Sequence, residues 1–410
     1  MINNISQFDN NEGVGGFKNG AYDKYAVHPT DINWTRQSRF AIPDNPKLLW
    51  KVTEENSYVD ETIVSGSFVV DRENNILVSD CDNNIFGEHF GRIIKVSNSG
   101  DKKEVFKTDM RLKPSVISKS GLIYLTTTND FESENDKLFC LYPDGTIRWE
   151  FPLNQSPHSK PVLDEEENVY LFTYSNEVGT LYSISSNGIL NWKCEFDSIN
   201  WYEPIISKDG IIYIGLNNHH TLCAFNKMGH KLWERKLGQG LGSYPPTIKN
   251  DGTIYARLSR KLLALDSEGN VLWTYTPKEG NVVTSPAIDM EGNLYLNLSN
   301  FRLVSLDSSG KERWITKVSG GVRVPPIIGK CKKIIQQSFM QNYPHYKSWI
   351  EVFSEKGEKI WTYELNGVII SSVLGKDNLI YILSNCHTFR KKGWKDKKIV
   401  KWELYSLGEE

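Results

Sequence analysis

A glycine four residues before a tryptophan recurs along the chain at nearly constant steps, and this repeat constrains the fold more than any other feature. The stretch "ALDSEGNVLW" at 264–273 returns as "SLDSSGKERW" at 305–314. Six pairs share the offset: Gly145/Trp149, Gly188/Trp192, Gly229/Trp233, Gly269/Trp273, Gly310/Trp314 and Gly357/Trp361. Successive tryptophans of these pairs are 43, 41, 40, 41 and 47 residues apart. A period of about 40–50 residues with strand-like content indicates a repeat protein, most often a β-propeller.

Residues 238–277 show what one repeat contains. Four short runs, "PPTIK", "TIYARL", "KLLALD" and "VLWTYT", are separated by a short link and by turns with the sequences "NDG" and "SEGN". Such turns accept the positive φ angles that tight hairpins need. The alternation of apolar and polar residues predicts four antiparallel strands that form one blade between two neighbours. We expect the tryptophan to be buried on the outermost strand as a wedge against the next blade. Full burial would contribute about 4–6 kcal/mol as an upper bound.

The wedge positions predict the number of blades. Eight positions can be assigned to outer strands: Trp50, Phe106, Trp149, Trp192, Trp233, Trp273, Trp314 and Trp361. The last segment offers three strands and "PKLLWKV" offers one, so together they complete a blade and close the ring without exposed sheet edges. We therefore predict an all-β, eight-bladed propeller of four-stranded antiparallel blades over 47–410. Residues 1–46 are polar and lack helical periodicity, and we expect them to form an extended arm over the ring.

The recurrent pattern "G-x-[IL]-Y…D-x-x-G-x-x-x-W", as in "DGTIYARLSRKLLALDSEGNVLW", resembles the pyrroloquinoline-quinone-like repeat of quinoprotein-type propellers. The resemblance covers about residues 31–408, and it implies the fold more than the function, because quinone dehydrogenases and outer-membrane assembly scaffolds share the repeat. Many such dehydrogenases place adjacent cysteines and a calcium site against the quinone. None of the six cysteines here is adjacent to another. We therefore expect no quinone cofactor, and free thiols.

Composition narrows the classes of partner and location. With a formal net charge of −2 the chain shows no basic footprint for nucleic acid. We find no apolar run long enough to span a bilayer and no signal peptide at the N-terminus. The sequence thus predicts a cytoplasmic protein, which we expect to be monomeric.

Histidines concentrate in the links that a propeller gathers on one face. The link between blades and the link between the second and third strands share this loop-rich face, while the hairpin turns face the other way. Six of the eight histidines fall there: His89, His158, His219, His220, His345 and His387. Trp201, Tyr202, Arg323 and Tyr343 add aromatic and cationic groups to these candidate ligand-binding residues. Long second-to-third strand links, such as 79–91, 127–137, 337–348 and 384–398, predict a wall over blades 1, 2, 7 and 8.

Two functions fit this face. The first is a non-catalytic binding propeller that recognises a protein or a glycan. The alternative is a carbohydrate-active enzyme (a polysaccharide lyase, hydrolase or isomerase) that uses His219, His220, His158 and Arg323, with a divalent metal left open. Packing and solvated loops explain each residue singly as well, and we expect the acidic loop with Asp130, Glu132, Glu134 and Asp136 to be a solvated hairpin. An enzyme should have a polar pocket at the channel mouth, whereas a recognition disc should expose apolar residues on its rim.

Overall fold

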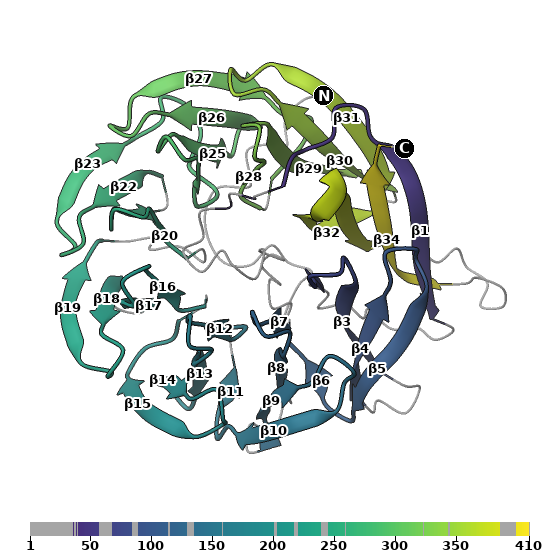
Figure 1. The fold of residues 1–410 in the computed structure, drawn as a ribbon. Coiled ribbons are helices and arrows are strands. Elements are labelled where there is room, and N and C mark those ends of the chain that lie inside the picture. Colours follow the sequence, from purple (N-terminus) through teal and green to yellow (C-terminus); the bar gives the residue numbers. More distant parts are fainter. Residues whose placement is uncertain are drawn as a thin grey trace.

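The computed structural model describes residues 36, 38, 40–56, 68–83, 89–113, 115–128, 135–157, 159–200, 203–216, 220–238, 245–258, 260–322, 324–342, 345–385 and 399–409. These residues form eight antiparallel sheets arranged around a central axis (Figure 1). Each sheet is a blade whose first strand lies nearest the channel and whose last strand forms the rim. The predicted all-β, eight-bladed propeller is confirmed.

Blades 1 to 4 follow one another along the chain. From the channel outwards, their strands are β2 Phe68–Val70, β3 Ile76–Asn83, β4 His89–Val96 and β5 Lys102–Thr108; β6 Arg111–Leu112 with β7 Val116–Ile117, β8 Ile123–Thr128, β9 Lys137–Leu141 and β10 Ile147–Pro152; β11 Ser156–Pro157 with β12 Val162–Leu163, β13 Val169–Ser175, β14 Val178–Ile184 and β15 Leu190–Phe196; β16 Ile205–Ile206, β17 Ile212–Leu216, β18 Thr221–Phe225 and β19 Lys231–Lys236.

Blades 5 to 8 complete the ring. Their strands are β20 Thr247–Ile248, β21 Ile254–Arg257, β22 Leu262–Leu265 and β23 Val271–Tyr275; β24 Ala287–Ile288, β25 Leu294–Leu298, β26 Arg302–Leu306 and β27 Glu312–Lys317; β28 Ile327–Ile328, β29 Ile334–Asn342, β30 His345–Phe353 and β31 Lys359–Asn366; β32 Val368–Leu374, β33 Ile380–Asn385, β34 Ile399–Gly408 and, from the other end of the chain, β1 Lys47–Asn56. A 3₁₀ turn, η2 (Lys376–Asn378), joins β32 to β33.

Blade 8 joins the two ends of the described chain as predicted. Strand β1 pairs with β34 from Lys47↔Gly408 to Asn56↔Ile399. Strand β34 pairs in turn with β33. The N-terminal strand therefore supplies the outer strand that the C-terminal segment lacks, and the ring closes without leaving β34 as an unpaired edge.

The glycine of each repeat serves the tryptophan of the preceding blade. Every wedge indole donates its Nε1–H to a backbone carbonyl oxygen 2.7–3.2 Å away: Trp50 to Asn98, Trp149 to Ser186, Trp192 to Lys227, Trp233 to Ser267, Trp273 to Ser308, Trp314 to Glu355 and Trp361 to Pro43. In the first six cases the accepting residue lies two positions before the turn glycine of the next blade. A Cβ on Gly229 would lie 2.6 Å from the Trp192 ring, and Gly229 has φ +80°. Only glycine meets both demands.

The wedge tryptophans are less buried than the sequence suggested. All seven lie partly exposed on the rim, so each contributes less than the upper bound of about 4–6 kcal/mol for full burial. The inner faces of six of them, all but Trp361, lie against a buried tyrosine of the second strand of the same blade, as in Tyr213–Trp233 and Tyr255–Trp273, with 5.8 Å between ring centroids. The tyrosine of the "G-x-[IL]-Y" pattern is therefore the inner partner of the wedge.

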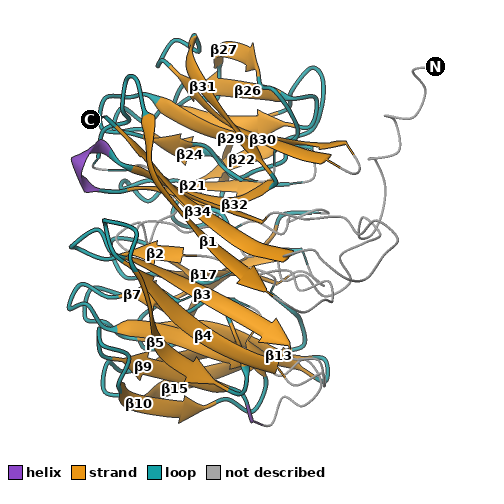
Figure 2. Cartoon of the chain, turned by 90° about the vertical axis from the view of Figure 1, so that its right-hand side faces the viewer, coloured by secondary structure: helices purple, strands orange, loops and turns teal. Residues whose placement is uncertain are grey.

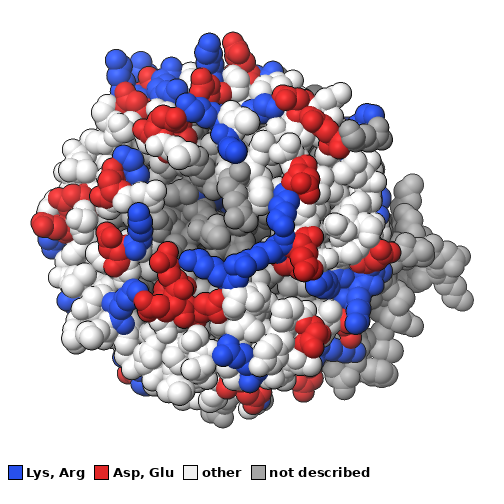
Figure 3. All heavy atoms as spheres, viewed as in Figure 1, with Lys and Arg blue, Asp and Glu red and all other residues white. Residues whose placement is uncertain are grey.

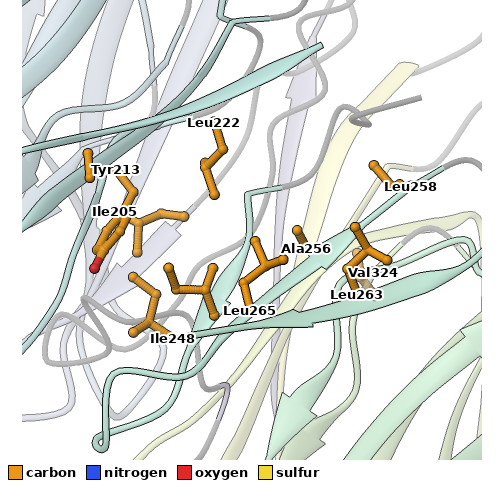
Figure 4. Close-up of a cluster of buried hydrophobic side chains, with 11 residues drawn as sticks. Ile205, Tyr213, Leu222, Ile248, Ala256, Leu258, Leu263, Leu265 and Val324 are labelled. Carbon is orange, nitrogen blue, oxygen red and sulfur yellow. The ribbon is translucent and has the colours of Figure 1, made fainter. Parts of the chain in front are cut away.

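The apolar core lies between blades. One cluster combines Ile205, Tyr213 and Leu222 of blade 4 with Ile248 and Leu265 of blade 5 (Figure 4). Similar clusters join the other neighbours around the ring, so each blade buries both faces. This packing makes each strand of the middle pair apolar on both sides, in contrast with the alternating outer strands.

A segment before β1 lies along the channel side of blade 7. The Ser38 amide donates to the Ile328 carbonyl at 2.7 Å, and the Ile328 amide donates to the Arg36 carbonyl at 2.9 Å. This pattern is that of a short parallel pairing with β28. The chain then runs outwards to β1, past Trp361 at Pro43. Residues 1–35 of the expected arm lie outside the described residues.

Candidate functional site

Most of the side chains that the sequence singled out lie outside the described residues. These are His158, Trp201, Tyr202, His219, Arg323, Tyr343 and His387. Of His89 and His345 only the backbone is described: they begin β4 and β30 and pair with Asn83 and Asn342. His220 has a left-handed backbone with φ +54°, and its carbonyl accepts the amide of Leu237 at 2.9 Å. That these histidines share a site stays a prediction.

Two of the long links are strands for most of their length. Residues 337–348 were expected to form a loop, but β29 and β30 pair up to Asn342↔His345. Likewise Ser79–Asn83 and His89–Gly91 belong to the β3–β4 pair. The strands run past the blade core as two-stranded ribbons, and Figure 2 shows them projecting towards one side of the disc. The loop interpretation of these ranges is therefore wrong, although the long strands do concentrate in blades 7, 8 and 1.

Asp136 does not belong to a solvated hairpin. Its side chain is buried and accepts a hydrogen bond from Ser156 Oγ at 2.8 Å, while its carbonyl accepts the Leu153 amide at 2.7 Å. The carboxylate thus fixes the start of blade 3 to blade 2. Asp130, Glu132 and Glu134 lie outside the described residues.

A network of charges joins blade 8 to blade 1. Arg92 of β4 donates to Asp80 at 2.8 Å and to Glu54 of β1 at 2.7 Å, and Lys102 lies 2.5 Å from Glu54. Burial alone would raise the pKa of Glu54, but the hydrogen bond from Lys102 and the charge of Arg92 outweigh it and lower that pKa. Each charge has an opposite partner, so this network is a structural seam of the ring.

A second buried pair bridges the links into blades 3 and 4 on the loop-rich face. Lys160 Nζ lies 3.4 Å from Glu203 Oε1, and Glu203 is buried. Both residues are sequence neighbours of the predicted His158, Trp201 and Tyr202. The pair holds adjacent links together, and such a closed ion pair leaves little charge for a ligand.

The histidine, cysteine and acidic side chains of the described residues do not gather into a metal-binding group. Among them no group of three or more histidine, cysteine or acidic side chains lies close enough to hold a metal. Cys140, Cys194, Cys223 and Cys331 are free thiols. Burial raises the pKa of Cys223 to about 12, so this thiol stays protonated at neutral pH. No helix within the described ranges is long and apolar enough to cross a membrane.

A bulge recurs at the same place in every outer strand. The residue directly before each wedge aromatic is skipped in the pairing with the third strand: Leu49, Val105, Arg148, Asn191, Leu232, Leu272, Arg313 and Ile360. A bulge lets two successive side chains point differently, so the aromatic ring can pack inwards while the preceding side chain is exposed, as it is for Leu49, Leu232, Leu272 and Ile360. It also disrupts the strand edge and discourages edge-to-edge aggregation.

Among the exposed apolar side chains of the rim, six lie on the three successive blades 3 to 5. We call this group the rim surface: Ile189, Leu190, Met228, Leu232, Val271 and Leu272. Met228 is 72% exposed, and both Val271 and Leu272 are 56% exposed. The hydrogen bonds from Trp192 and Trp233 hold each turn against the preceding outer strand, so these residues follow one another around the rim along β15, β19 and β23 (Figure 1). They lie at the end of the strands opposite the loop-rich face.

The sequence carries a signal for exposed apolar side chains on the outer strands. An aliphatic residue precedes the wedge tryptophan in "KLW" and "VLW" of blades 4 and 5, and also in "KIW" and "LLW" of blades 7 and 8, outside the rim surface. In a strictly alternating strand this residue would face solvent and should be polar.

The face of the disc seen in Figure 3 differs from the rim surface, because it mixes acidic and basic side chains. Ion pairs such as Lys227–Glu166 and Lys332–Glu291 join neighbouring turns on it.

Comparison with known proteins agrees with this geometry. Residues 187–327 match the family model described as outer membrane protein assembly factor BamB. Among solved structures, BamB from Moraxella catarrhalis is similar with a TM-score of 0.59 at 13% identity, over 89% of this chain and 100% of that one. The chain is a β-propeller of pyrroloquinoline-quinone-like repeats.

Other propellers are similar over the same span. The C-terminal WD40 domain of Sif2 gives a TM-score of 0.56 at 10% identity and covers 91% of this chain and 100% of that one. The Dos1 propeller gives 0.54 at 12% identity, over 90% and 96%. No curated protein matches the chain. At these identities the comparisons establish the fold of this propeller, and its function must be argued from its surfaces.

Proposed function

We propose that this propeller is a non-catalytic scaffold that binds a partner protein through the rim surface. The observation that supports this function most is the run of six exposed apolar side chains on three successive blades. Exposed apolar residues scattered singly are ordinary, but a contiguous group on a rigid body is typical of a protein-binding surface. The similar structures, which include BamB and a WD40 domain, agree with a scaffold role.

The chemistry of the rim surface favours a protein over a small ligand. Small molecules bind in concave pockets, whereas the rim is the convex edge of the disc. Met228 and the aliphatic side chains adapt to an apolar partner, because methionine is unbranched and flexible. We do not extend the proposal to a glycan or to a carbohydrate-active enzyme: His158, His219 and Arg323 lie outside the described residues, and no comparison supports that alternative. Monomeric state and cytoplasmic location also stay predictions.

Site-specific photo-crosslinking tests the rim surface. A crosslinking amino acid is placed at position 228 or 272, and in a control protein at position 360, where the side chain of Ile360 is also exposed on an outer strand. A protein captured at 228 and 272 but not at 360 is then purified and titrated against the propeller by calorimetry. We expect Leu232→Gln/Leu272→Gln to weaken its binding at least about tenfold, as is typical when apolar anchors are lost. Leu48→Gln/Ile360→Gln should leave binding unchanged. Equal affinity for both variants, or no specific capture, would refute the proposal.

A further inference from the structure

The short link between the second and third strands of blade 6 places a strained, exposed phenylalanine on the loop-rich face. Phe301 has φ +59° and is 44% exposed. Its carbonyl accepts the Val318 amide at 3.0 Å, as the His220 carbonyl accepts Leu237 in blade 4. The left-handed backbone therefore serves the tight link, but glycine or asparagine would adopt it with less strain. The tight link accounts for the left-handed backbone at this position, but it does not require a phenylalanine side chain there.

Two positive charges without acidic partners lie directly beside Phe301. Arg302 and Lys317 are cross-strand partners in the β26–β27 pair. Neither side chain forms an ion pair or a hydrogen bond within the described part of the chain. Like charges placed directly opposite one another destabilise a sheet. The sheet thus carries an electrostatic cost at this position that no acidic side chain among the described residues offsets.

Other like-charged cross-strand pairs in the propeller are neutralised. Arg92 lies opposite Lys107, but Arg92 contacts Asp80 and Glu54. Lys95 lies opposite Lys103, and Lys95 Nζ is 3.5 Å from Asp71. In both of these cross-strand pairs of cations, one cation therefore contacts an acidic side chain. Arg302 and Lys317 have no such acidic contact among the described residues.

The link that enters blade 7 lies next to the Phe301 ring and is held in place by backbone hydrogen bonds. A Cβ on Gly321 would lie 3.7 Å from Phe301 Cε1 and 3.8 Å from Phe339 Cε1, so both rings border this glycine. Gly321 and Phe339 exchange two backbone hydrogen bonds of 2.9 Å, which fix the link to β29. An apolar group of a partner would therefore meet a preformed surface between two rings.

We propose that Phe301, Arg302, Lys317 and Gly321 bind an acidic segment of a partner protein, with an apolar side chain seated against Phe301 and flanking carboxylates on the two cations. Charge complementarity selects the acidic partner, and the strained phenylalanine supplies the apolar anchor. This surface lies at the opposite end of the strands from the rim surface. It goes beyond the proposed function, and either can fail without the other.

Fluorescence anisotropy of the full chain tests the site with a labelled peptide, Asp-Glu-Leu-Phe-Glu-Asp, at low ionic strength. We expect saturable binding that weakens about tenfold or more in Arg302→Gln/Lys317→Gln and in Phe301→Asn, and that also weakens when salt is added. Lys311→Gln/Lys330→Gln makes the same change in net charge at exposed residues elsewhere and should bind as the parent protein does. Because asparagine tolerates the left-handed backbone, Phe301→Asn should unfold at the same or a higher urea concentration.

Four outcomes would overturn the proposal. They are no binding at about 1 mM peptide, equal weakening in the Lys311/Lys330 control, equal binding of the uncharged peptide Asn-Gln-Leu-Phe-Gln-Asn, and equal binding of the acidic peptide in which serines replace Leu-Phe. The rim variant Leu232→Gln/Leu272→Gln should bind the peptide normally. Peptide binding without partner capture at the rim surface would refute the rim proposal alone, and partner capture at the rim surface without peptide binding would refute this proposal alone.

Discussion

Blades 4 and 5 meet through an apolar interface, whereas blades 8 and 1 meet through an apolar core with a network of charges beside it. At the first junction Ile205, Tyr213 and Leu265 are buried together, and Trp233 bonds to the next turn. Among the described residues of these two blades no ion pair crosses the junction. At the second junction an equivalent core, which includes Trp402, is joined by the contacts of Arg92 with Asp80 and Glu54.

The difference follows from how the two junctions form. Blades 4 and 5 are neighbours along the chain, so their register is set by short turns and by the repeat itself. Blade 8 takes its outer strand from the far end of the sequence, and closure must select one pairing of β1 with β34 and blade 1. Glu54 meets its cations only in that arrangement, so we attribute to the charges a role in specifying closure, which apolar contacts alone define less sharply.

Arg92→Met should destabilise the protein most, because it removes the central cation of the junction between blades 8 and 1. The change leaves Asp80 and Glu54 carboxylates at the seam without their shared cation, and we expect a loss of about 3–4 kcal/mol in the free energy of unfolding. Urea denaturation followed by tryptophan fluorescence measures it. Lys193→Met removes an exposed pair with Glu195 and should leave the free energy of unfolding nearly unchanged, because solvent screens such a pair. Similar losses in both variants would mean that the network contributes no more than a surface ion pair.

Gly229→Ala tests the contact between the turn glycine of one blade and the wedge tryptophan of the preceding blade. Its new Cβ would lie 2.6 Å from the Trp192 ring at φ +80°, so backbone strain and displacement of the wedge add up to about 2–3 kcal/mol. Gly252→Ala is the matched control, with φ +88° but a nearest contact of 3.5 Å, and should cost about 1 kcal/mol. Urea midpoints of the two variants decide the matter. If both cost the same, only the turn conformation requires the glycine, and the indole contact does not.

The sequence predicted the regular part of this molecule far better than its seams and surfaces. The Gly–Trp spacing was enough for the blades and for closure, because each repeat contains a full set of local turn and strand signals. It did not show that Gly229 packs on Trp192, since the partners belong to different repeats. The ribbon of residues 337–348 was mistaken for a loop because its strands leave the core, where backbone pairing continues without an apolar pattern. Arg92 was missed for the same reason: it follows a segment, 79–91, interpreted as loop.

Acid should weaken the seam between blades 8 and 1 and leave the junction of blades 4 and 5 largely unaffected, and this is the smallest effect we expect. The folded protein lowers the pKa of Glu54, so as pH falls the unfolded chain takes up this proton first. The stabilisation from Glu54 is therefore complete above its unfolded pKa of about 4.3 and is lost as pH falls through the lower folded value. Solvent screening keeps the effect below about 1 kcal/mol. Between pH 6 and pH 3 the urea midpoint of Glu54→Gln should fall less than that of the parent protein, while Glu195→Gln should follow the parent. Parallel curves for all three proteins would show that the acid sensitivity of the ring arises elsewhere.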